Sequence, residues 1–62
     1  MGYVKCKLIG EDSNIFNLMG LASRALRNEG YRTEADEMCK EVMKTITFDE
    51  ALFVITKYVD AE

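Results

Sequence analysis

The shortness of the chain restricts its fold more than any other property. Sixty-two residues can enclose a single hydrophobic core, so the sequence predicts one domain spanning residues 1–62. A domain of this size buries only about 60% of the surface that its unfolded chain exposes. Small proteins compensate with disulfides, bound metals or oligomerisation, and the residues indicate which of these this chain can use.

Two cysteines, Cys6 and Cys39, occur without close spacing, and the chain has no histidine. No secretory segment or long apolar run accompanies them, so we expect a cytoplasmic protein that does not enter a membrane. In that setting the cysteines are interpreted as two reduced, buried thiols, with a disulfide or redox pair as the alternative. Oligomerisation, first of all as a homodimer, is then the remaining source of stability.

The pattern of apolar residues predicts one strand and three helices. Apolar and polar residues alternate over residues 3–9, which is typical of a half-buried strand that Gly10 ends. Helical spacing follows over residues 14–28, after three candidate N-capping residues within the segment 11–14 and before Gly30, which suits a left-handed C-cap. Two further helices are predicted over residues 34–44, capped by Thr33, and over residues 48–60, where Thr47 and Glu50 form a capping box.

These elements predict a mostly α fold, in which one short N-terminal β-strand is followed by a three-helix bundle. The core is expected from three apolar stripes, one on each helix. A single strand cannot satisfy its own backbone groups, so it must pair with an extended piece around residues 58–61 or with another copy of the chain. Either pairing would make the fold a small α+β domain. The predicted stripes are Ile15, Leu18, Met19, Ala22, Ala25 and Leu26; Ala35, Met38, Cys39, Val42 and Met43; and Phe48, Ala51, Leu52, Ile55, Tyr58 and Val59.

Three residues do not fit this pattern and form the candidate partner interface. Phe53 falls opposite the predicted core face of the third helix, and Phe16 flanks that of the first. Gly20 costs about 1 kcal/mol relative to alanine in a helix interior, so we expect a close neighbour there, with the N-terminal strand as the nearest candidate. An exposed aromatic side chain can anchor a protein interface, although Phe53 could equally contact the strand or the chain end.

No pattern of residues predicts an enzyme. Nucleophilic catalysis by serine or cysteine needs a base, and without histidine none is evident. Cys6 has a lysine on each side, but strand alternation places it on the core face, away from both. Carboxylates adjacent in sequence point in different directions on a helix, and phosphate-binding and calcium-binding loop patterns are missing. We therefore expect no catalytic residue, metal or cofactor.

Charge is divided unevenly along the chain, whose net charge is −3. Residues 1–32 carry five basic and three acidic side chains, whereas residues 33–62 carry three basic and eight acidic ones. Arg24, Arg27 and Arg32 form a candidate nucleic-acid patch, while a DNA-reading third helix is disfavoured by its acidic residues. Nucleic acid is accordingly the less favoured partner.

The segment Val4-Lys5-Cys6-Lys7-Leu8-Ile9-Gly10-Glu11-Asp12-Ser13-Asn14-Ile15-Phe16, followed by Gly20, resembles a family of short bacterial and phage proteins. In that family a strand leads through Gly-x-Asp-Gly-Asn to an aromatic residue on a helix, and Ser13 replaces the second glycine here. The similarity continues through residues 47–52 and 57–59. The resemblance implies a bacterial or mobile-element setting and carries no activity with it.

Together these observations predict a non-enzymatic interaction or regulatory protein. We expect it to act by binding another macromolecule through its helical surface, with a second copy or another protein as partner. The alternative is a nucleic-acid-binding accessory protein that uses the basic patch on the first helix.

Overall fold

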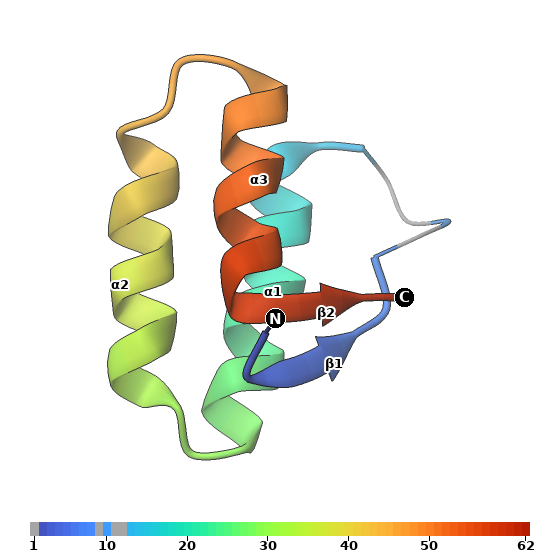
Figure 1. The fold of residues 1–62 in the computed structure, drawn as a ribbon, viewed down its shortest axis with the longest axis vertical. Coiled ribbons are helices and arrows are strands. Elements are labelled where there is room, and N and C mark those ends of the chain that lie inside the picture. Colours follow the sequence, from blue (N-terminus) through green and yellow to red (C-terminus); the bar gives the residue numbers. More distant parts are fainter. Residues whose placement is uncertain (1, 9, 11–12) are drawn as a thin grey trace.

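The computed structural model describes residues 2–8, 10 and 13–62 and shows a mostly α fold (Figure 1). The described elements are β1 (Val4–Cys6), α1 (Ile15–Asn28), α2 (Arg32–Met43), α3 (Phe48–Tyr58) and β2 (Val59–Ala61). The three helices pack side by side, and the two strands extend to the side opposite α2. The predicted fold class is therefore confirmed.

Two helices begin at the predicted N-caps. At α1, the Asn14 side chain accepts a hydrogen bond of 2.9 Å from the backbone N–H of Phe16. At α3, the Thr47 hydroxyl oxygen accepts one of 3.1 Å from the N–H of Glu50. Each cap satisfies a backbone donor that the first helical turn leaves unpaired. Of the other two cap candidates, Asp12 lies outside the described residues, and Ser13 directly precedes the N-cap.

Gly30 ends α1 as predicted, with a left-handed φ of 89°. Its N–H donates to the Arg27 carbonyl at 3.0 Å, and the Tyr31 N–H donates to the Leu26 carbonyl at 2.8 Å. This pair of bonds defines a Schellman motif, which satisfies carbonyls at the helix end. The chain thereby turns directly from α1 into α2.

The predicted start of α2 was wrong by two residues. The helix begins at Arg32, and Thr33 lies within its first turn. Tyr31 occupies the N-cap position without a side-chain cap, and its carbonyl accepts a hydrogen bond of 2.9 Å from the N–H of Ala35. Because the Schellman motif already aligns Tyr31 for helical bonding, the helix starts before the threonine. The helix ends at Met43, with Lys44 as its C-cap.

The predicted end of α3 was also wrong, because the last turn is replaced by a strand. α3 ends at Tyr58, and β2 pairs in parallel with β1. The expected alternative, pairing with a C-terminal extended piece, is therefore confirmed. One edge of β1 is thus paired within the chain. The register pairs Val4 with Val59, Lys5 with Asp60 and Cys6 with Ala61.

Among the described residues, the core contains only apolar ones, and all three helices and both strands contribute to it. Val54 is buried although it was not predicted, whereas Phe48 and Met43 were predicted as buried and are exposed. Both exposed residues lie at a helix end, Met43 at the last position of α2 and Phe48 at the first position of α3. The buried residues are Cys6, Leu8, Leu18, Ala22, Leu26, Ala35, Met38, Val42, Ala51, Val54, Ile55 and Val59.

Close backbone packing occurs at Gly2 and not at Gly20. A Cβ atom placed on Gly20 would meet no atom of the described residues within 4 Å, so the predicted close neighbour is not found in that part of the chain. A Cβ atom on Gly2 would lie 2.4 Å from the carbonyl carbon of Val59. The Gly2 N–H also donates to a carboxylate oxygen of Asp60 at 2.9 Å. Gly2 is therefore fitted tightly against β2.

Candidate functional site

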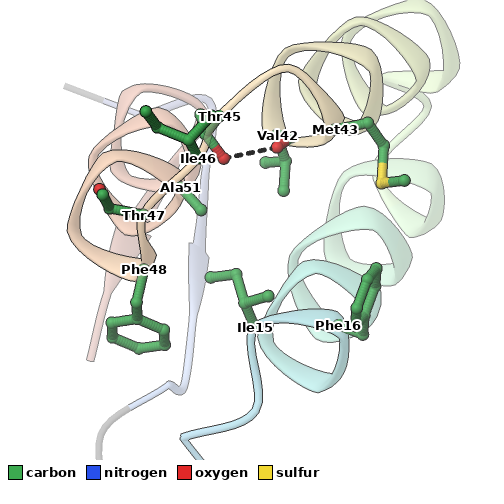
Figure 2. A pocket seen from close by; sticks show the side chains of 9 residues that line it. All are labelled: Ile15, Phe16, Val42, Met43, Thr45, Ile46, Thr47, Phe48 and Ala51. Carbon is green, nitrogen blue, oxygen red and sulfur yellow. Dashed lines mark hydrogen bonds between the residues drawn. The ribbon is translucent and has the colours of Figure 1, made fainter.

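A hollow of about 280 Å³ opens at the end of the bundle where α1 begins, α2 ends and α3 begins (Figure 2). We call it the apolar groove. Val42 and Ala51 are its buried members, and the other lining side chains are partly or largely exposed. Its lining consists of Ile15, Phe16, Val42, Met43, Thr45, Ile46, Thr47, Phe48 and Ala51.

Four large apolar side chains at the apolar groove face solvent. Their exposed fractions are 61% for Phe16, 64% for Met43, 89% for Ile46 and 41% for Phe48. Only two other large hydrophobic residues are exposed in the described part of the chain, Tyr3 and Phe53. Exposed apolar residues scattered singly are ordinary, but a cluster around one hollow is typical of an interaction site.

The linker between α2 and α3 is fixed at both ends, and this holds Ile46 outward. The Thr45 hydroxyl donates to the Val42 carbonyl at 2.6 Å, as the dashed line in Figure 2 shows. On the other side of Ile46, Thr47 caps α3. The two threonines restrain the backbone on either side of Ile46, so its exposure is built into the linker.

The structure brings two of the three predicted interface residues together. Phe16 lines the apolar groove, and Gly20 is exposed four residues further along α1, on the same helical face. Phe53 is 68% exposed but does not line the groove. Sequence reasoning missed Met43 and Phe48, because helical spacing placed both on buried stripes. Their positions at helix ends were the available signal.

The predicted basic patch is partly compensated by an acidic residue. Arg24 and Arg32 are exposed. Arg27 donates to the Asp36 carboxylate at 2.5 Å and to the Ser23 hydroxyl at 3.2 Å. Because Arg27 has a carboxylate partner, the patch attracts phosphate less strongly than three free arginines would.

Near the C-terminal end of α2, a polar cluster joins this helix to α3. The Tyr58 hydroxyl donates to one Glu41 carboxylate oxygen at 2.6 Å, and the Lys57 ammonium donates to the other at 2.9 Å. The hydrogen bond to Glu41, with burial second, raises the pKa of Tyr58 to about 12. The same bond, followed by that from Lys57, lowers the pKa of Glu41. The cluster is a structural link between the helices.

Both cysteines are free, with Cys6 buried and Cys39 half-buried. Burial, and secondly the negative charge of Glu62, raises the pKa of the Cys6 thiol. Cys6 therefore stays protonated at neutral pH, which opposes a nucleophilic role. In the part of the chain that the structure describes, no three acidic, cysteine or histidine side chains converge to hold a metal ion.

Comparison with family models, with curated proteins and with solved structures finds no match to this chain. The resemblance to short bacterial and phage proteins therefore stays a prediction. None of the helices among the described residues combines the length and apolar character needed to cross a membrane.

Proposed function

We propose that this protein is a non-enzymatic interaction protein that binds a protein partner through the apolar groove. The observation that carries the proposal is the cluster of Phe16, Met43, Ile46 and Phe48, four exposed apolar side chains around one hollow. Burying them against a partner removes apolar surface from water, which is the main favourable contribution to protein association.

The available surface is sufficient for a reversible contact. With about 200 Å² for a fully exposed side chain of this size, the four residues present about 500 Å² of apolar surface. At about 25 cal/mol/Å² this corresponds to roughly 12 kcal/mol of gross stabilisation. Association itself costs about 4–15 kcal/mol. The balance favours a partner bound with moderate affinity, as a regulatory or accessory protein requires.

The cellular setting belongs to the same proposal. A buried free thiol at Cys6 and a half-buried one at Cys39 suit a reducing compartment, which supports a cytoplasmic location. The resemblance of the N-terminal segment supports a bacterial or phage origin.

Site-specific photo-cross-linking in the expressing cell tests the proposal. A benzophenone side chain at Ile46 should give a cross-linked protein adduct, because Ile46 is the most exposed of the four large apolar groove residues. The same probe at Thr33, which is exposed on the first turn of α2, serves as the control. The adduct at Ile46 should disappear when Met43→Lys places a charge in the apolar groove. Equal adducts at both positions, or none at Ile46, would contradict the proposal.

A further inference from the structure

We infer that the occupant of the apolar groove is a second copy of this chain, bound across a two-fold axis. This inference rests on the proposed function and names its partner. In such an isologous contact each copy presents the same surface, so Phe16, Met43, Ile46 and Phe48 of both copies are buried together. Three observations support a second copy: the area of the surface, the charges beside it and the position of Gly20.

The exposed apolar area fits a symmetric dimer. Each copy presents about 500 Å² from the four groove residues. Two copies would therefore bury about 1,000 Å² from these side chains alone, which reaches the lower limit for a specific interface. The polar residues around the groove add to this area. Because both copies contribute the same surface, a two-fold contact buries enough apolar area for a stable complex.

The charged residues next to the groove residues are of opposite sign, so those of one copy can complement those of a second copy. Lys44 follows Met43 at the end of α2, and Asp49 and Glu50 follow Phe48 in the first turn of α3. All three are exposed. Positive charge thus adjoins the groove residue Met43 at the end of α2, and negative charge adjoins the groove residue Phe48 at the start of α3. A two-fold axis can bring Lys44 of each copy to Asp49 of the other, whereas a partner of one charge would be repelled at one side.

Gly20 gives the third observation. It lowers the helix propensity of α1, yet nothing in the described part of the chain lies near enough to require a missing side chain. It is exposed on the same helical face as Phe16. A glycine there leaves room for another backbone to approach α1 closely. In the dimer, Gly20 is where the partner copy comes nearest to the helix.

Sedimentation equilibrium of the full chain, from low micromolar to millimolar concentration, tests this inference. The native protein should reach twice its 7.1 kDa chain mass. Phe16→Ser should weaken dimerisation about a hundredfold or more, because each dimer loses two central aromatic side chains. Phe53→Ser is the matched control, since Phe53 is similarly exposed and lies outside the groove. It should leave the dimer unchanged.

Charge reversal tests the two-fold arrangement. Lys44→Glu should weaken the dimer about tenfold, and adding Asp49→Lys to that variant should restore it. Gly20→Gln should also weaken the dimer while circular dichroism shows unchanged helical content. A native chain that stays monomeric at millimolar concentration, or a dimer that Phe16→Ser leaves intact, would overturn the inference. In that case cross-links from Ile46 to a different protein would still support the proposed function, and their absence would refute both.

Discussion

Removal of the Tyr58 hydroxyl provides a direct test of the contact between α2 and α3. In Tyr58→Phe, the hydrogen bond of 2.6 Å to Glu41 is lost, while the ring and its contact with Tyr3 remain. Lys57 continues to bind the other oxygen of the Glu41 carboxylate. The substitution therefore isolates one hydrogen bond between two helices.

The size of the effect follows from the pKa of Tyr58. A rise from 10.0 to about 12 corresponds to about 2.7 kcal/mol for a fully shielded group. The Glu41 and Lys57 side chains are 40% and 48% exposed, so solvent screens the cluster. We therefore expect Tyr58→Phe to lower the free energy of unfolding by about 1 kcal/mol. This loss corresponds to a melting temperature lower by about 4–8 °C.

The stability difference between the native protein and Tyr58→Phe should depend on pH. Tyr58 has its pKa raised by folding, so its contribution is complete below pH 10.0 and is lost as the pH rises toward about 12. Glu41 has its pKa lowered, so its contribution is present above pH 4.5 and is lost as the pH falls through the lowered value. The difference should thus be largest between these limits.

Urea unfolding followed by circular dichroism measures this difference at each pH. Tyr31→Phe is the matched control, because the Tyr31 hydroxyl has no hydrogen bond to the described residues, and it should change stability little. An equal loss in both variants, or a Tyr58→Phe effect that does not change between pH 10.0 and about pH 12, would refute this interpretation of the cluster.

Three further predictions concern two glycines, Gly30 and Gly2, and the basic patch. Gly30→Ala should lower the free energy of unfolding by about 1–2 kcal/mol, because it forces a side chain into a left-handed φ. Urea unfolding measures this loss, and an unchanged unfolding midpoint would contradict the Schellman motif. Gly2→Ala should lower the melting temperature, because its Cβ overlaps the backbone of Val59; an unchanged value would show that the contact carries no stability. In gel-shift assays with a salt series, DNA and RNA should not bind, since Asp36 compensates Arg27; steeply salt-dependent binding would support the alternative function instead.

Most helical elements could be predicted because their signals are local. Asn14, Thr47 and Gly30 act within one helical turn, so the sequence was enough to place the corresponding helix ends. The start of α2 was wrong because Thr33 offered a good local cap, while the preceding turn had already aligned Tyr31. The way in which α1 ends therefore determines where α2 begins.

The parallel pairing of β1 and β2 depends on residues far apart in sequence. Apolar residues continue at helical spacing through Val59, so periodicity alone predicted an end of α3 beyond Tyr58, where the helix ends. Pairing with Val4 then outweighed helix continuation, because it satisfies backbone groups of both strands. Helix propensity, which depends on neighbouring residues, contains no information about such a long-range strand pairing.

The apolar groove was only partly predicted from the sequence. Phe16 stood outside its apolar stripe and was identified, whereas Met43 and Phe48 matched their stripes and were assigned to the core. Helical periodicity gives the direction of a side chain around the helix axis. It does not say whether a neighbouring helix extends far enough to cover that position, and this decides exposure at helix ends.

The most direct test of the apolar groove as the contact between copies is a concentration series of ¹H–¹⁵N NMR spectra. We predict that the backbone amides of Phe16, Gly20, Met43 and Ile46 shift as the protein is concentrated from micromolar to millimolar, while that of Phe53 stays in place. Spectra that do not change with concentration, or shifts centred on Phe53, would contradict this account.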